Sequence, residues 1–419
     1  MGKSYYISME VVIEAYRRVR ANKGAPGVDD QSIEEFEKDL EKNLYKIWNR
    51  MSSGSYQPPP VKTVEIPKAD GKVRQLGIPT VSDRVAQMVV KIYLEPEIER
   101  CFCEDSYGYR PGKSGLQAIE VARKRCWNYS WVVDLDIKGF FDNIDHELMM
   151  DAVRKHTQEP WILLYIERWL QAPVQGIDGT ISPKRTLGTP QGGVISPLLA
   201  NLFLHYAFDM WMKRTFKKNP FERYADDIIV HCKTENEAIL LKELIKLRLS
   251  KCKLELHPEK TKIVYCKDAN RPNSSPWEKF DFLGYTFRAR SSRNYKGELF
   301  PNFAPAISEK AKKHIRDETK KRFKKVKSNR TFTELAKELN PAITGWLNYF
   351  GKYHASELWA VMVYIEKIIL KWIKKKYKNL QGWKAGKRWL DSIKKRQPYL
   401  FTHWKWMRRN DLERTSRMK

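Results

Sequence analysis

Apolar residues fall at two different spacings in the first hundred residues of this 419-residue chain. Spacings of three and four place side chains on one helix face. Helices are therefore predicted over 8–21, 31–51 and 82–100. Alternation of apolar and polar residues predicts two strands, over 61–66 and 73–78. Asp70-Gly71 stands between these strands and is typical of a hairpin turn.

The middle of the chain alternates strands with helices. A mostly apolar strand ends at Asp136, two strands flank a tight turn at 225–227, and another strand follows at 261–266. Helical spacing fills the stretches between them, including a helix that Ser196 would cap and Pro197 would open. The resulting β-α-β-β-α-β order is that of a ferredoxin-like sheet and predicts an α+β fold. Because many functions use that sheet, the order alone names no activity.

Beyond residue 305 the pattern becomes helical and basic. Three helices of a bundle-like unit are predicted over 307–327, 332–353 and 355–378. The tail over 383–410 mixes Trp, Tyr and Phe with Lys and Arg. Within it, Trp404 and Trp406 fit a hydrophobic core as well as they fit base stacking.

Charge changes this picture, because the chain is strongly basic. Its 78 Lys and Arg exceed its 50 Asp and Glu by 28, and its isoelectric point is about 9.7. Residues 301–419 alone hold 31 Lys and Arg against 10 Asp and Glu, with seven of the 14 Trp. Such an excess indicates a polyanionic partner, most simply a nucleic acid.

Composition also excludes some classes of protein. A mean hydropathy of −0.61, without an apolar run of 18 residues, excludes an integral membrane protein. The six cysteines contain no C-x-x-C pair, so no zinc site is expected. No targeting segment opens the sequence, and we expect an intracellular protein with free thiols.

Three carboxylates carry the candidate chemistry. Asp226 and Asp227 are adjacent at the predicted hairpin tip, and the strand that ends at Asp136 lies beside that hairpin in the predicted sheet. Adjacent carboxylates repel one another, which a cation between them relieves. Oxygen ligands without His or Cys suit Mg²⁺, and two such ions would activate a hydroxyl and steady a leaving pyrophosphate. The sequence therefore predicts phosphoryl or nucleotidyl transfer.

Plainer interpretations stand beside this one. Asp residues favour turns through local hydrogen bonds, which alone would account for Asp226 and Asp227. Asp134 shares the strand face of Asp136 and is a rival ligand, although a structural cap suits it better.

Nine short motifs follow one another along the chain. They lie at 22–29, 66–68, 74–80, 107–111, 136–142, 188–201, 224–227, 282–285 and 345–350. In this order they resemble the motifs of a group II intron-encoded reverse transcriptase, also called a maturase, and their joint order is more specific than any one of them.

The resemblance implies a right-hand polymerase in the bacterial cytoplasm, associated with the nucleoid or with ribonucleoprotein. Its palm would contain the ferredoxin-like sheet, and its thumb would be helical. The expected parts are an N-terminal extension of the fingers (1–60), fingers (61–130), palm (131–300), thumb or maturase (X) domain (301–380) and a basic aromatic C-terminal extension (381–419).

The resemblance also assigns the catalytic and metal-binding groups. Asp136, Asp226 and Asp227 would be the catalytic metal ligands, joined by the backbone carbonyl of Ile137. They would hold two Mg²⁺ ions, for which Mn²⁺ is a substitute.

Four further residues would bind the incoming deoxynucleotide. Lys68 and Arg74 would clamp the triphosphate, with a solvated basic turn as the alternative, and Gln191 would hydrogen-bond near the sugar. Phe141 would exclude a 2′-hydroxyl, the alternative being a core Phe. Lys260 is a candidate for protonating the pyrophosphate, although Lys262 is close by.

The implied function is that of an RNA-directed DNA polymerase which also binds the intron RNA to assist splicing and retrotransposition. Its partners would be an RNA template-primer duplex, the group II intron RNA, a DNA target and dNTPs, with neither membrane nor zinc. The alternatives are a splicing-only RNA-binding maturase and a retron or diversity-generating reverse transcriptase. Because no Cys follows Cys266, no HNH-type endonuclease is expected.

Overall fold

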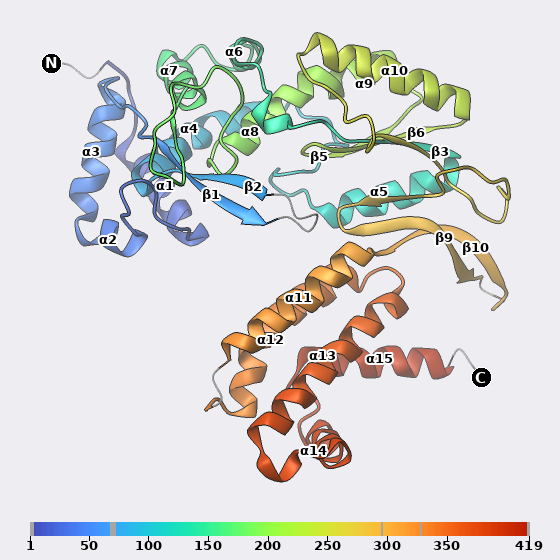
Figure 1. The fold of residues 1–419 in the computed structure, drawn as a ribbon. Coiled ribbons are helices and arrows are strands. Elements are labelled where there is room, and N and C mark those ends of the chain that lie inside the picture. The colour runs from blue at the N-terminus through green and yellow to red at the C-terminus, as the bar shows by residue number, and fades with distance from the viewer. Residues whose placement is uncertain (1–3, 68–72, 295, 327–328, 417–419) are drawn as a thin grey trace. The chain divides into compact units, whose positions relative to one another are not determined.

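The computed structural model describes residues 4–67, 73–294, 296–326 and 329–416. The chain divides into two compact units. The first contains Met1–Ala118 and Trp131–Ile263, and the second contains Ile119–Ser130 and Val264–Lys419. Figure 1 shows the path of the chain through both.

Helices open the first unit. They are α1 (Met9–Asn22), α2 (Ile33–Lys38), α3 (Leu40–Ser52) and, after the first strands, α4 (Val81–Glu99), which packs on α1 and α3. The single helix expected over 31–51 is wrong, because Asp39 separates α2 from α3. Its φ of −121° and ψ of 43° leave the helical region. Asp competes for backbone hydrogen bonds and is a poor residue for a helix interior.

The strands expected over 61–66 and 73–78 are confirmed. β1 (Val61–Pro67) pairs with β2 (Val73–Ile78) in antiparallel fashion, and the short β4 (Val174–Gln175) pairs with β1 in parallel. The Asp70-Gly71 turn lies outside the described residues. Burial does not alternate along these strands: exposure increases along β1 and decreases along β2.

A four-stranded sheet follows, in the order β5-β6-β3-β7. Its strands are β3 (Trp131–Leu135), β5 (Phe221–Tyr224), β6 (Asp227–Cys232) and β7 (Lys262–Tyr265), and the chain passes into the second unit within β7. Helix α5 (Gly115–Asn128) precedes β3. A short 3₁₀ turn (Phe140–Asp142), α6 (His146–Arg154), α7 (Pro160–Leu170), α8 (Ser196–Leu204) and α9 (Met210–Thr215) lie between β3 and β5. Helix α10 (Glu235–Lys251) packs on β3 and β6 (Figure 1).

The expected cap at Ser196 is wrong. Ile195 precedes the helix, and Ser196 is its first residue, with Pro197 next. The Ser196 hydroxyl instead accepts a hydrogen bond from the Thr189 hydroxyl at 3.0 Å. At its other end α8 continues into a π-helical turn, His205–Asp209, a rare form that often marks functional sites.

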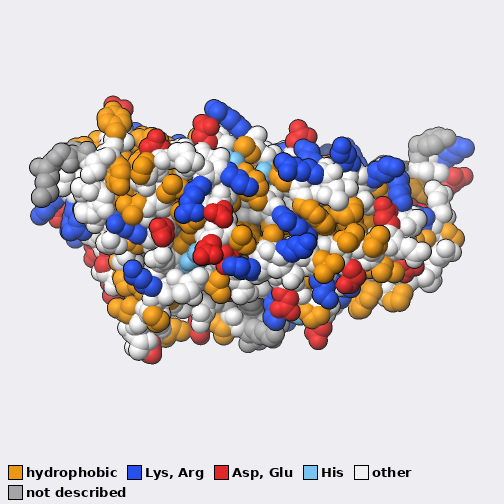
Figure 2. Space-filling model, turned by 90° about the horizontal axis from the view of Figure 1, so that it is seen from above, with side chains coloured by type: hydrophobic (Ala, Val, Ile, Leu, Met, Phe, Trp, Pro, Cys, Tyr) orange, Lys and Arg blue, Asp and Glu red, His pale blue; other side chains and the backbone are white. Residues whose placement is uncertain are grey.

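One contiguous apolar cluster forms the core of the first unit, with side chains from α1, α4, α7, α8 and β6 among others. Figure 2 looks onto the upper side of Figure 1, where α6, α7 and α10 lie. Among the described residues on that face, Lys and Arg are interspersed with Asp and Glu.

The second unit combines a three-stranded antiparallel sheet with a helical bundle. The sheet, which the sequence pattern did not predict, contains β8 (Lys279–Phe282), β9 (Tyr285–Arg293) and β10 (Leu299–Ile307). The bundle contains α11 (Glu309–Lys325), α12 (Phe332–Phe350), α13 (Ala355–Lys376), a 3₁₀ turn (Lys378–Leu380), α14 (Trp383–Arg396) and α15 (Thr402–Ser416). The three helices expected after residue 305 are therefore confirmed to within a few residues.

The C-terminal helices contribute to the second core. Trp404 is 3% exposed and belongs to that cluster, while Trp406 is half-buried against it. Of the two interpretations of Trp404, core packing is confirmed. No helix in the described part of the chain is both long enough and apolar enough to span a membrane.

Candidate active site

A two-residue turn joins β5 to β6 and presents adjacent carboxylates. Tyr224 pairs with Asp227, which leaves Ala225 and Asp226 as the turn. Ala225 has a φ of 55°, in the left-handed region that residues with a side chain rarely adopt. Such strain persists only where the surroundings enforce it and is frequent at active sites.

Strand register brings Asp136 to the same end of the sheet. Leu135 pairs with Ile228 in the antiparallel β3–β6 ladder, so Asp136, the next residue, lies beside Asp227. Burial raises the pKa of Asp226, the nearby charge of Asp136 raises it further, and Arg74 lowers it. The three predicted carboxylates are thus within electrostatic range of one another.

Two polar groups contact Asp136 directly. The Lys260 ammonium lies 3.2 Å from its carboxylate, and the Thr261 hydroxyl accepts a hydrogen bond from its backbone N–H. Lys260 therefore pairs with a predicted metal ligand, whereas the sequence suggested a role at the pyrophosphate. Asp134 is half-buried on the same strand face and pairs with Ile229 in the β3–β6 ladder.

The Ile137 carbonyl is oriented away from the neighbouring segment. The N–H of Lys138 donates to Glu255, and the N–H of His257 donates to the Asp136 carbonyl, on either side of the Ile137–Leu256 bridge. In an antiparallel ladder this alternation turns the backbone groups of Ile137 away from Leu256. Ile137 as a whole is 4% exposed, and its side chain belongs to the core of the first unit, so its backbone carbonyl is the group that could act as a ligand.

The donor set at this end of the sheet fits a divalent cation. It consists of oxygens alone, the type of ligand that Mg²⁺ and Mn²⁺ prefer. Burial is the main reason that the pKa of Asp226 is raised, and the charge of Asp136 adds to it, so a cation at this place would favour the ionised carboxylate.

Arg74 and Gln191, two of the residues expected to bind a nucleotide, lie side by side. The Arg74 guanidinium donates to the Gln191 side-chain oxygen at 3.0 Å. The backbone N–H of Gly77 donates to the Gln191 carbonyl at 2.7 Å, which ties β2 to the loop before α8. Lys68 lies outside the described residues.

Phe141 differs from its buried neighbour Phe140. Phe140 is 2% exposed and forms part of the core, while Phe141 is half-buried and packs on it edge to face, with ring centroids 5.4 Å apart. The Phe141 carbonyl accepts a hydrogen bond from the Thr189 N–H at 2.8 Å. The backbone that carries Phe141 is thereby joined to the loop that carries Gln191.

Sequence reasoning missed the groups that hold the turn. Arg223 is fully buried and donates to both carboxylate oxygens of Asp209, at 2.7 and 2.6 Å. It also donates to the Ala225 carbonyl at 3.2 Å and to Asn201, whose amide donates to the Gly108 carbonyl. The available signal was the pair of charged residues, Glu222 and Arg223, between Phe221 and Tyr224 in a predicted strand, because charged residues inside a sheet need buried partners.

A second buried group holds the loop before α8. The Gln87 oxygen accepts from the backbone N–H groups of 194–195, at 2.8 and 3.3 Å, and its amide donates to Asp83 at 2.9 Å. Asp83 also accepts from the Tyr56 hydroxyl and the Trp169 indole, and burial raises its pKa to about 6. Because most neighbouring residues on α4 are apolar, the sequence pattern indicated only an ordinary hydrophobic core here.

Two family models match the chain. Residues 66–287 match the model described as reverse transcriptase (RNA-dependent DNA polymerase). Residues 312–389 match the group II intron, maturase-specific domain. Every described site residue above, apart from Tyr56, lies within the first of these segments.

Several known proteins are similar in sequence. Group II intron-encoded protein LtrA of Lactococcus lactis subsp. cremoris is 29% identical, over 70% of this chain and 57% of its own length. Protein YkfC of Escherichia coli K12 is 31% identical, over 68% of this chain and 82% of its own length. A putative COX1/OXI3 intron 1 protein of Saccharomyces cerevisiae is 26% identical, over 49% of this chain and 24% of its own length. The chain thus spans 57% of the length of LtrA.

Proposed function

The chain belongs to the reverse transcriptase family and contains a group II intron maturase-specific domain, and from this premise we propose that it is the RNA-directed DNA polymerase of a group II intron. Family membership gives it a right-hand polymerase fold. Its further role is to bind the intron RNA and assist splicing and retrotransposition. The site described above is the site of nucleotidyl transfer.

The register of β3 and β6 supports this proposal most directly. In this register Asp136 lies beside Asp227, at the turn that carries Asp226. The two strands that contribute these residues are about ninety residues apart in sequence. These three carboxylates and the Ile137 carbonyl are the ligands we propose for two Mg²⁺ ions, with Mn²⁺ as a substitute. When bound, such cations supply positive charge to the attacking hydroxyl and to the leaving pyrophosphate.

The remaining site residues bind and orient the nucleotide. Arg74 meets the triphosphate, together with Lys68, and Gln191 hydrogen-bonds near the sugar. The exposed part of Phe141 takes the space of a 2′-hydroxyl and favours deoxynucleotides. Holding reactants in line in this way is the main means of catalysis in phosphoryl transfer.

The finer architecture follows from the same proposal. Fingers extend over 1–130 with their N-terminal extension, the palm over 131–300, the thumb over 301–380 and a C-terminal extension over 381–419. The partners are an RNA template-primer duplex, the intron RNA, a DNA target and dNTPs. The protein acts in the bacterial cytoplasm, associated with the nucleoid or with ribonucleoprotein.

Primer extension on poly(rA)/oligo(dT) with Mg²⁺ tests the proposal. We expect extension by the wild type and a loss of at least about a thousandfold in Asp226→Ala, because a metal ligand contributes several kcal/mol at the transition state. Asp151→Ala is the matched control, since Asp151 is exposed on α6 and lies outside the site.

The main alternative is a splicing-only RNA-binding maturase. A wild type that folds, binds the intron RNA and does not extend primers would favour that function over polymerisation. Equal primer extension by Asp226→Ala and the wild type would contradict the assignment of the catalytic site.

A further inference from the structure

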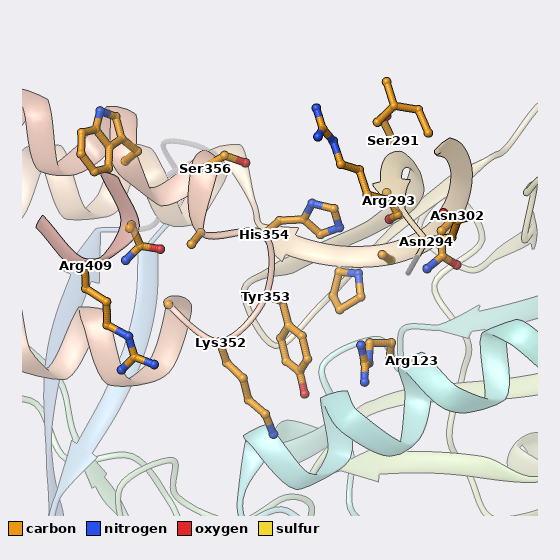
Figure 3. Close-up of a pocket in the computed structure, with 18 of the residues that line it drawn as sticks. Arg123, Ser291, Arg293, Asn294, Asn302, Lys352, Tyr353, His354, Ser356 and Arg409 are labelled. Carbon is orange, nitrogen blue, oxygen red and sulfur yellow. The ribbon is translucent and has the colours of Figure 1, made fainter. Parts of the chain in front are cut away.

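A cavity of about 1090 Å³ lies within the second unit. Its walls come from α5, the β9–β10 hairpin, the turn before α13, and α15 (Figure 3). All of the lining residues belong to the second unit, so the cavity is a property of that unit alone. The proposed polymerase site leaves it unexplained.

The charge of the lining has one sign. Its cations are Arg123, Arg293, Lys352 and Arg409. No carboxylate stands among the described lining residues, while three Asn and three Ser side chains add neutral hydrogen-bonding groups. A concave surface of this composition attracts an anion that also carries hydrogen-bond donors and acceptors.

An aromatic pair gives the cavity a second chemistry. The rings of Trp359 and Trp406 have centroids 6.3 Å apart and an interplanar angle of 36°. Both indoles are half-buried and line the cavity, so the pair presents a partly exposed ring surface. Nucleic-acid bases stack on such rings irrespective of their sequence.

The start of α13 adds a place for a phosphate. Ala355 and Ser356, the first two residues of this 22-residue helix, line the cavity. His354 precedes them in the left-handed region, with a φ of 44°, and its side chain does not cap the helix. Backbone N–H groups and the helix dipole favour negative charge at this end.

One wall is held in place from behind. Glu120, which does not line the cavity, pairs with Arg123 at 3.0 Å and Lys352 at 3.3 Å, and it accepts a hydrogen bond from the Tyr353 hydroxyl. The Tyr353 hydrogen bond, with the two cations, lowers the Glu120 pKa to about 2. The two cations are thus oriented before any ligand arrives, which lowers the entropic cost of binding.

We propose that this cavity binds an unpaired nucleotide of an RNA strand, with its base on the Trp359–Trp406 pair and its phosphate among the cations. The proposal rests on the proposed function, which makes RNA the partner. A duplex keeps its bases stacked inside, so only a single-stranded or looped segment would use both the rings and the charge.

Binding of a fluorescent 12-nucleotide single-stranded RNA to the full chain, followed by anisotropy, tests this inference. We expect Trp359→Ala to weaken binding about tenfold, because one stacked base is lost. Arg293→Ala should also weaken RNA binding, and it should make the plot of log binding constant against log salt concentration less steep by about one. The matched controls, Trp383→Ala and Arg396→Ala, alter exposed residues of α14 outside the lining and should bind like the wild type.

Three readouts separate the outcomes. A 4-thiouridine strand should crosslink to the peptides that contain Trp359 or Trp406, and blunt RNA duplex should bind equally to all folded variants. Unchanged single-strand binding by both cavity variants would overturn the inference. Primer extension by the same variants distinguishes failure of this inference from failure of the proposed function, because primers would still be extended if only RNA binding in the cavity were absent.

Discussion

At the scale of single residues, the buried Arg223–Asp209 pair has the largest consequence for the site. Both side chains are fully buried, and the guanidinium holds the turn carbonyl of Ala225 as well as Asp209. A buried ion pair adds little net stability compared with apolar residues, but removal of one partner leaves an uncompensated charge. The pair therefore determines the position of the turn more than it stabilises the fold.

Arg223→Met should lower the free energy of unfolding by about 3–5 kcal/mol, because Asp209 would remain charged and buried. Urea unfolding monitored by circular dichroism measures this change. The double variant Arg223→Met/Asp209→Leu should recover much of the loss. If the double variant were no more stable than the single one, the stranded charge would not be the cause.

Asp83 predicts a pH dependence of stability. Its pKa is about 6 in the folded protein, raised by burial from an ordinary value of 3.8. The folded state therefore holds the proton more tightly than the unfolded chain, so this group favours folding at low pH, and its contribution is lost as the pH rises through about 6. Asp83→Asn removes the titration. The free energy of unfolding of the wild type relative to this variant should decrease between about pH 4 and pH 7.

Urea midpoints at three pH values in that range provide the measurement. Asp151→Asn serves as the control, because Asp151 is an exposed residue of α6 outside the Asp83 cluster. A constant difference between the wild type and Asp83→Asn across the range would show that Asp83 does not titrate with a raised pKa.

At the scale of elements, the segment around Gly108 supports the β5–β6 turn through backbone contacts. The Tyr107 N–H donates to the Arg223 carbonyl at 2.8 Å. A Cβ at Gly108 would lie 2.5 Å from the Ala225 backbone nitrogen, a distance that real contacts do not allow. Only glycine permits this approach, so the turn and the segment are fitted to one another.

Gly108→Ala should therefore displace the turn and reduce primer extension by about a hundredfold, because misplacing reacting groups by about 1 Å has that effect. Steady-state extension kinetics, with thermal unfolding alongside, would measure it. Gly382→Ala is the control, since a Cβ there meets only Ala385, at 4.0 Å. Full activity in a folded Gly108→Ala protein would contradict the argument.

The elements also show what sequence patterns can reveal. The β1–β2 hairpin and the β5–β6 hairpin were predictable, because alternation and turn residues are local signals. The break at Asp39 was missed, although Asp is a poor residue for a helix interior, because helical spacing continues on both sides of it. The π-helical turn at His205–Asp209 was missed because no Gly or Pro marks it in the sequence. Asp136, Asp226 and Asp227 were predicted from their types and order, whereas Arg223 and Gln87 act through partners distant in sequence.

At the scale of the whole molecule, net charge predicts how the proposed RNA binding responds to salt. Lys and Arg exceed Asp and Glu by 28 overall, and residues 301–419 hold most of that excess. If the chain neutralises about six or more phosphates, affinity should fall by about a thousandfold or more between 50 and 200 mM salt. Equilibrium binding to a fixed RNA at several salt concentrations measures the slope. A fall of less than about tenfold would mean that few cations contact phosphate.

The chain crosses between its two units at three places, near 118, 130 and 263. Helix α5 begins in one unit and continues into the other, and its Ile119, Ala122 and Cys126 are fully buried. A chain truncated after residue 263 would keep this helix but lose the rest of the unit to which those side chains belong. To exchange the second unit between two relatives, both of its segments, 119–130 and 264–419, would have to be exchanged together. A chimaera joined at a single point would combine segments of that unit from two different proteins and should fold poorly.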